Sequence, residues 1–223
     1  MRLGVKPTVF LARLVAFLLL TYVCWKPVAP AYTHLLTFLT RNFLHLTEIS
    51  RDPQLNQVTE MEVRQTTEGR PGIMYRHRLF PENIQGIPAE WVQANMVLLI
   101  PLMLAIPAAS YRQRWIRLGV ALSVAVIVQV LDISVTVKSF YANELGRYSY
   151  DYYSPWLRRL YQFGDSFVQG MDTQLFPFAI WAGIHFNQLL GRRPAAVTPA
   201  QQTPPVAADK SADRKRKAAT KTG

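Results

Sequence analysis

The first candidate for chemistry is a carboxylate inside an apolar segment. Asp132 lies 16 positions after Ile116, where that segment begins, which is about 24 Å along a helix at ~1.5 Å per residue. Ionisable groups within membrane segments are costly and are often functional. Asp132 could therefore bind or act on a lipid-linked substrate. It could equally pair with an outer arginine, such as Arg41 or Arg76, and serve packing alone.

Basic and histidine side chains form a second candidate, a site for an anionic headgroup. His34, Arg41 and His45 recur at helical spacing on one face. His77 lies between two arginines in a later polar segment. Together these groups could bind phosphate or carboxylate oxygens. The plainer interpretation is that they form solvated polar faces.

Trp156 belongs to the third candidate, an aromatic segment at residues 138–172. Its rings could stack on sugars or hold an extended peptide. The alternative is an aromatic belt at the membrane surface, where tryptophan and tyrosine are enriched. His185 could carry a proton, but a hydrogen-bonded histidine near a membrane edge is the simpler reading.

Cysteine chemistry and metal binding have little support. Cys24 is the single cysteine, so no intramolecular disulfide and no cysteine-based zinc site is possible. No positioned base accompanies it, which argues against a nucleophile. The sequence contains no HxxxH pair and no glycine-rich phosphate loop. It therefore predicts no catalytic residue, no metal and no cofactor.

Apolar segments must position these candidates, and they predict a membrane protein. A hydrocarbon core of about 30 Å needs ~20 apolar residues in a helix. The first segment could instead be a cleaved signal peptide, because Ala29-Pro30-Ala31 resembles a cleavage site. We favour a retained anchor, because the apolar run is longer than is usual for a signal peptide. We expect four spans, at about residues 8–24, 91–109, 116–137 and 174–190.

Charge placement predicts the threading. Arg112 and Arg114 lie in the short turn between the second and third segments, and basic residues also flank both chain ends. Positive charge marks the cytoplasmic side, so we expect both termini in the cytoplasm. Residues 47–90 and 138–172 would then lie outside, as an insert and an aromatic loop within a membrane domain of residues 1–190.

Periodicity predicts the outer elements. Residues 28–46 and a segment from Pro155 repeat at helical spacing and suggest two interfacial amphipathic helices. Gln57–Gln65 and Ile73–Phe80 alternate as in two strands, with Ile73, Tyr75, His77 and Leu79 on one side. The expected fold is thus a membrane all-α protein with a small β element: four transmembrane helices, two interfacial helices and an extracytoplasmic β-hairpin.

The C-terminal segment, residues 191–223, reads as a disordered basic tail in the cytoplasm. Its cluster Arg214, Lys215, Arg216 and Lys217 suits anionic lipid. The net charge of +11 follows from such flanks, so membrane lipids are the expected partners. No nucleic-acid partner is expected.

Two short stretches resemble a known family. Trp25-Lys26-Pro27-Val28-Ala29-Pro30-Ala31-Tyr32 and Ala94-Asn95-Met96-Val97-Leu98, with the Ile106-Pro107 exit, are similar to the membrane proteins associated with exosortase H. The resemblance implies an accessory role in protein sorting at the bacterial inner membrane. It also implies an exosortase-type protein or its substrates as partners. The Cys/Arg/His set of the exosortases themselves is not transferred to Cys24.

Two functions follow as expectations. The first is a non-enzymatic accessory protein that binds a membrane partner or a substrate protein on its outer face. The alternative is a membrane enzyme or binding protein for a lipid-linked substrate, using Asp132. A small transporter is less well supported, because the spans hold no charge at the midplane.

Overall fold

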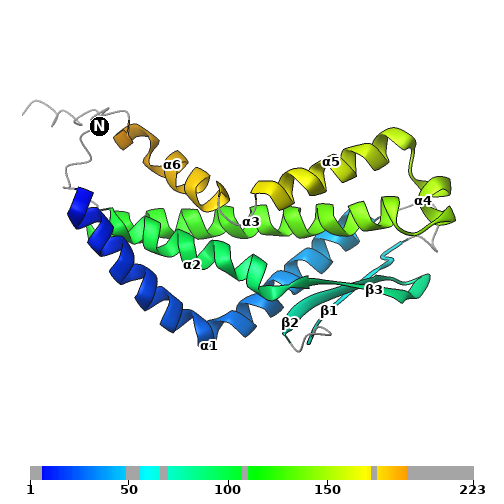
Figure 1. Cartoon of the computed structure of the whole chain (residues 1–223), viewed down its shortest axis with the longest axis horizontal. Coiled ribbons are helices and arrows are strands. Elements are labelled where there is room, and N and C mark those ends of the chain that lie inside the picture. The colour runs from blue at the N-terminus through cyan, green and yellow to red at the C-terminus, as the bar shows by residue number, and fades with distance from the viewer. Residues whose placement is uncertain (1–6, 49–55, 66–69, 107–109, 172–174, 190–223) are drawn as a thin grey trace, which may run out of the picture. The chain divides into compact units, whose positions relative to one another are not determined.

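This computed structural model describes residues 7–48, 56–65, 70–106, 110–171 and 175–189. The predicted tail, with Arg214, Lys215, Arg216 and Lys217, lies outside the described residues. The described residues are mostly helical, with one small antiparallel sheet (Figure 1). In chain order the elements are α1 (Pro7–Thr47), β1 (Thr59–Gln65), β2 (Pro71–His77), β3 (Phe80–Pro88), α2 (Ala89–Ala105), α3 (Tyr111–Asn143), α4 (Arg147–Tyr152), α5 (Pro155–Met171) and α6 (Leu175–Leu189).

Helix α1 joins two elements that the sequence separates. A span at 8–24 and a distinct interfacial helix at 28–46 were expected, but one 41-residue helix covers both. Pro27 and Pro30 lie inside it. Each proline removes a backbone donor and crowds the preceding turn, which bends a helix without necessarily ending it. Figure 1 shows the change of direction in the middle of α1.

In the part of the chain that the structure describes, two helices, not four, are long and apolar enough to cross a membrane: α1 from Thr8, and α3. Helices α2 and α6 are apolar but have only 17 and 15 residues, fewer than the ~20 that a full crossing needs. The predicted spans at 91–109 and 174–190 are corrected accordingly. Helix α2 ends at Ala105 with Ile106 extended, because the residue before a proline disfavours helical geometry.

Helix α3 is longer than the predicted span at both ends. Its N-terminus is capped by Ser110, whose hydroxyl accepts a hydrogen bond from the Gln113 amide at 3.2 Å. The residues expected to form a turn around Arg112 are therefore its first turn. With 33 residues, α3 extends about 50 Å at ~1.5 Å per residue. That length exceeds a bilayer core of about 30 Å, so one end must project from it.

Polar side chains tie α1, α2 and α3 together. The Tyr32 hydroxyl of α1 donates to the side-chain oxygen of Gln129 in α3. The Gln129 amide in turn donates to the carbonyl of Val92 in α2, at 2.7 Å. Gln129 is buried, so these bonds satisfy a polar group that would otherwise be costly.

The sheet has three strands in the order β1-β2-β3, not the two of the predicted hairpin. The first pairing, with Met61 opposite Tyr75 and Thr59 opposite His77, confirms the predicted hairpin. Ile73, Tyr75 and His77 share one side of β2, as predicted, and are buried, so the solvated face considered for His77 is wrong. Leu79 is 48% exposed because it lies in the turn after β2. Strand β3 contains Pro81 and Pro88, which obscure a strand pattern but are tolerated at a sheet edge.

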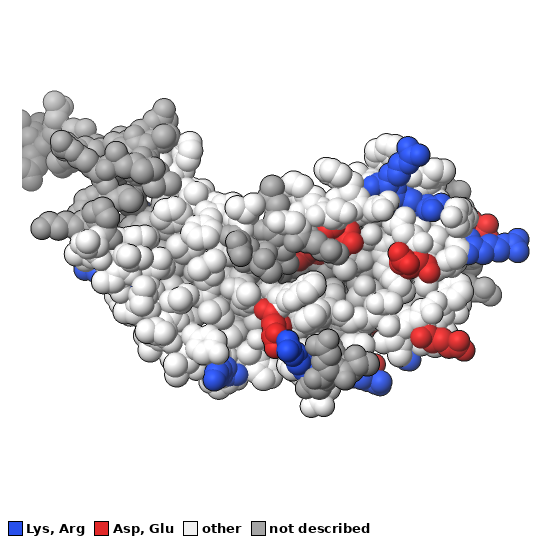
Figure 2. All heavy atoms as spheres, in the orientation of Figure 1, with Lys and Arg blue, Asp and Glu red and all other residues white. Residues whose placement is uncertain are grey.

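Charged and apolar surfaces are separated. Most side chains in the apolar part of α1 are exposed, among them several leucine and valine side chains. In the face shown in Figure 2, lysine, arginine, aspartate and glutamate gather over the half that holds the sheet, α4 and α5, and the opposite half is nearly free of them. An apolar surface of this extent is typical of a membrane or protein contact.

Candidate functional site: a polar pocket between α1 and the sheet

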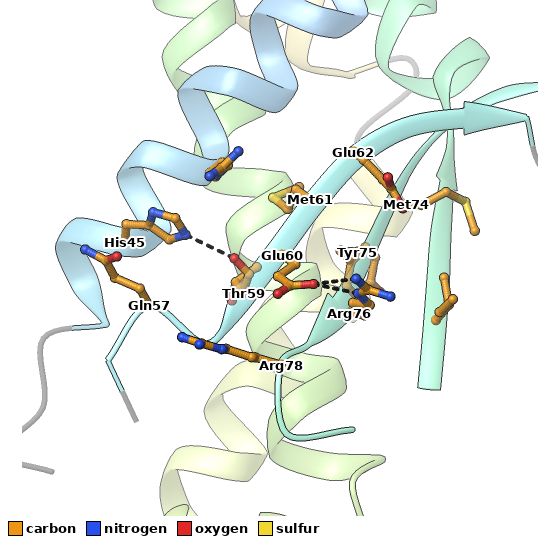
Figure 3. Close-up of a pocket in the computed structure, with 12 residues that line it drawn as sticks. His45, Gln57, Thr59, Glu60, Met61, Glu62, Met74, Tyr75, Arg76 and Arg78 are labelled. Carbon is orange, nitrogen blue, oxygen red and sulfur yellow. Dashed lines mark hydrogen bonds and ion pairs between the residues drawn. The ribbon is translucent and has the colours of Figure 1, made fainter. Parts of the chain in front are cut away.

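The second half of α1 and the sheet enclose a pocket of about 380 Å³ (Figure 3). This volume lies in the usual range of ligand sites, about 300–1,000 Å³. Its lining is mostly polar. The residues that line it are Arg41, His45, Gln57, Thr59, Glu60, Met61, Glu62, Met74, Tyr75, Arg76, Arg78 and Ile84.

Some charged side chains of the pocket form ion pairs, and others do not. Arg76 and Glu60 stand opposite each other on β2 and β1 and form an ion pair at 2.7 Å. Glu62 is paired with Arg64 at 2.8 Å. Among the described residues, no carboxylate lies within ion-pair distance of Arg41 or Arg78. The pocket thus keeps two arginines available to an anion, and arginine binds carboxylate or phosphate through two parallel hydrogen bonds.

His45 fixes one wall of the pocket. Its Nε2 atom lies 3.0 Å from the carbonyl oxygen of Thr59, and a carbonyl only accepts. Nε2 therefore carries the proton and donates, which joins α1 to β1. Figure 3 shows this bond beside the Glu60–Arg76 pair.

A buried ion pair lies behind this wall. The Lys138 ammonium of α3 is 2.7 Å from the carboxylate of Glu48, whose side chain is only 2% exposed. The same carboxylate accepts hydrogen bonds from the amide of Thr59, at 3.1 Å, and from its hydroxyl. Glu48 thus joins the end of α1 to the first residue of β1 and to the C-terminal half of α3.

Neither member of this pair was identified from the sequence. Glu48 stands three residues after His45, at the end of a helical pattern. That spacing was the available signal, but the partner 90 residues away could not be inferred from it.

His77 is buried next to the pocket but does not line it. Its Nδ1 accepts a hydrogen bond from the Leu79 amide at 3.2 Å. Nε2 therefore carries the proton, and it has no hydrogen-bond partner among the described residues. The rings of Tyr148 and Tyr141 lie 4.6 and 4.9 Å from the imidazole, centroid to centroid. Burial lowers the pKa of His77 to about 4, and Lys138 adds to this effect while Glu48 opposes it.

The other predicted residues are dispersed. His34 is exposed on α1, and Asp132 is partly buried on α3; neither lines the pocket. Trp156 is 70% exposed on α5. Of the residues considered for headgroup binding, Arg41 and His45 line the pocket, and His34 and His77 do not.

The pocket contains groups that bind and few that could react. Arginine stays protonated in proteins and cannot act as a base, and both glutamates are in ion pairs. Burial raises the pKa of Tyr75, which keeps its hydroxyl protonated. In the described part of the chain, no group of three or more histidine, cysteine, aspartate or glutamate residues could hold a metal ion. No protein-family model, curated protein or solved structure matches the chain.

Proposed function

We propose that this chain is a multi-pass protein of the bacterial inner membrane that binds a partner protein on its outer side without catalysing a reaction. The observation that carries the proposal is the pocket with two available arginines, Arg41 and Arg78, on the charged half of the molecule. The apolar half, with α1 and α3, supplies the anchor.

The membrane arrangement rests on length and surface. The first half of α1 and the first part of α3 cross the bilayer. The shorter α2 and α6, with 17 and 15 residues, return the chain through it where the bilayer is locally thinned. The outer part of α3, the sheet and the second half of α1 then stand outside. With the arginine-rich start of α3 in the cytoplasm, both chain ends lie on that side.

The arginines define the chemistry of the partner. A segment that offers aspartate or glutamate side chains, or a free C-terminal carboxylate, would place its oxygens between Arg41 and Arg78. Such a ligand also fits the position of the pocket at β1, an edge strand. Main-chain groups at a sheet edge can add hydrogen bonds to an extended peptide.

The resemblance to exosortase H-associated proteins makes an exosortase-type membrane protein, or one of its substrates, the first partner to examine. In this role the chain would hold its partner beside the membrane. The catalytic residues would belong to that partner.

The test is affinity purification from membranes dissolved in mild detergent. We expect the parent chain to recover a partner in stoichiometric amount, and the double variant Arg41→Gln/Arg78→Gln to lose it. Arg147→Gln is the matched control, because Arg147 is highly exposed and lies outside the pocket. Recovery of the parent alone would contradict the proposal, and so would equal recovery of the partner by the double variant.

A further inference from the structure

A second and larger cavity, of about 650 Å³, lies beside the bend of α1. Most of its surface is apolar, unlike that of the first pocket. It lies between α1 and α2, with two residues of the sheet at one end. The residues that line it are Leu18, Tyr22, Trp25, Lys26, Ala29, Pro30, Thr33, Val63, Pro71, Glu90, Gln93, Ala94, Val97 and Leu98.

The sequence explains why this space is open. Pro30 lines the cavity in the bent part of α1, where the helix changes direction. The facing positions Ala29 and Ala94 have side chains too small to fill the space. Above them, the Gln93 amide donates to the Thr33 hydroxyl at 3.0 Å and joins the two helices. This hydrogen bond therefore joins α1 and α2 at the lining of the cavity.

The cavity is polar at one end and apolar at the other. Helix α2 contributes Glu90 and Gln93 at the outer end, and Val97 and Leu98 at the inner end. Glu90 to Leu98 spans about 12 Å at ~1.5 Å per residue.

Lys26 supplies a positive charge at the bend. Its ammonium lies 5.4 Å from the centre of the Tyr22 ring, and no ion pair with a carboxylate occurs among the described residues. Glu90, the acidic group of the cavity, is instead 3.3 Å from Arg70. The cation is thus available to an anionic headgroup, as expected for lysine at a membrane interface.

The cavity also opens toward the surface that would face the bilayer. Leu18 and Tyr22 line it and are exposed, and they belong to the long apolar stretch of α1. A lipid could therefore enter sideways from the membrane. A soluble ligand would meet apolar side chains.

We propose that this cavity binds one anionic phospholipid. An acyl chain lies along Leu18, Val97 and Leu98, and the phosphate lies beside the Lys26 ammonium. The inference rests on the membrane insertion proposed above but not on the partner protein. The lipid holds the bent part of α1 against α2, next to the sheet that forms the polar pocket.

The test is native mass spectrometry of the full chain in mild detergent, with phosphatidylglycerol or phosphatidylcholine added. We expect one phosphatidylglycerol per chain, and loss of this adduct in Ala94→Phe, which fills the cavity. We expect Lys26→Gln to keep lipid binding but to lower the preference for phosphatidylglycerol by about fivefold, the effect of one basic residue near a membrane surface. Inorganic phosphate should not displace the lipid.

Matched controls separate the cavity from the general lipid surface. Val124→Phe adds the same ring at an exposed position of α3, and Arg13→Gln removes a charge at the other end of α1; both should bind lipid as the parent does. Equal adducts in Ala94→Phe and Val124→Phe would overturn the proposal, as would an unchanged preference in Lys26→Gln. A dimer that Ala94→Phe abolishes would assign the cavity to a second copy and also overturn it. Arg41→Gln/Arg78→Gln should keep the lipid, so this test and the partner test fail independently.

Discussion

At the scale of single residues, the ion pair of Glu48 and Lys138 matters most for the position of the polar pocket. Both side chains are largely removed from solvent, at 2% and 15% exposure. The carboxylate also accepts two hydrogen bonds from Thr59, a residue of the pocket wall. The pair therefore joins three segments far apart in sequence at one point, and the pocket depends on it.

Removing one member of this pair should destabilise the protein strongly. Lys138→Met leaves the Glu48 carboxylate buried without its cation, and we expect a loss of about 3–5 kcal/mol in the free energy of unfolding. The double variant Glu48→Gln/Lys138→Met should recover much of that loss, because no buried charge remains. Denaturant titrations of the parent, Lys138→Met, Glu48→Gln and the double variant measure this. A double variant as unstable as the sum of the single ones would show that the two groups do not interact.

His77 predicts a pH dependence of stability. Its pKa is about 4 in the folded chain against 6.5 for an ordinary histidine, so the unfolded chain takes up its proton first as the pH falls. Above about pH 6.5 the neutral His77 contributes about 3 kcal/mol to the free energy of unfolding. This contribution is lost as the pH falls toward 4. Titrations of unfolding free energy from pH 7.5 to pH 4.5 measure the slope. The nearby charges of Glu48 and Lys138 are present in every chain compared.

Two histidine substitutions test whether His77 causes this slope. His77→Phe keeps an aromatic ring among Tyr141, Tyr148 and Phe80 but cannot be protonated, so its stability should depend less on pH. His34→Gln removes an exposed histidine and should keep the slope of the parent. If the slopes of His77→Phe and the parent agree, His77 is not the group responsible.

The candidate residues were predictable only in part. The helical spacing of Arg41 and His45 placed them on one face, and both line the pocket. The spacing could not show that His34, on the same helix, stays outside it. Nor could it show that β2 turns His77 inward, among rings supplied by α3 and α4, because that contact depends on how distant elements pack.

At the scale of elements, α5 packs closely against the C-terminal half of α3. A Cβ atom at Gly164 would be 3.1 Å from Cγ1 of Val135. One position further, Asp165 accepts a hydrogen bond from Thr136 at 2.9 Å. A small residue at 164 is therefore what allows α5 to approach α3 and make this bond.

Gly164→Leu should separate the two helices. Because overpacking of a close contact costs about 1–3 kcal/mol, we expect a loss of that size in unfolding free energy. Gly170→Leu is the control in the same helix, where nothing lies within 4 Å of the added Cβ; it should be neutral or slightly stabilising, since glycine is a poor helix former. Denaturant titrations compare the two, and equal losses would contradict the contact.

Elements were predicted well where one period dominated, and less well where proline intervened. The alternation of β1 and β2 identified both strands, and the spacing after Pro155 identified α5. The end of the apolar run near residue 24 suggested two elements in what is one helix, bent around Pro27 and Pro30. Pro81 and Pro88 concealed β3, an edge strand whose pairing with β2 compensates for the poor local pattern.

At the scale of the whole molecule, α3 packs against two different sets of helices. Its N-terminal half packs with α2 and α6, and its C-terminal half packs with α4 and α5 (Figure 1). Its length of about 50 Å allows it to cross a bilayer and continue outside. Hydropathy indicated an apolar segment here, but only the packing shows that the same helix also supports α4 and α5.

The threading of the chain is tested most directly by labelling with a membrane-impermeant maleimide. In a Cys24→Ser background, which removes the exposed native thiol, Glu82→Cys places a thiol on β3, and Arg112→Cys places one in the first turn of α3. In intact spheroplasts we predict rapid labelling of Glu82→Cys, and labelling of Arg112→Cys only after lysis. Labelling of both before lysis, or of Arg112→Cys alone, would contradict the account.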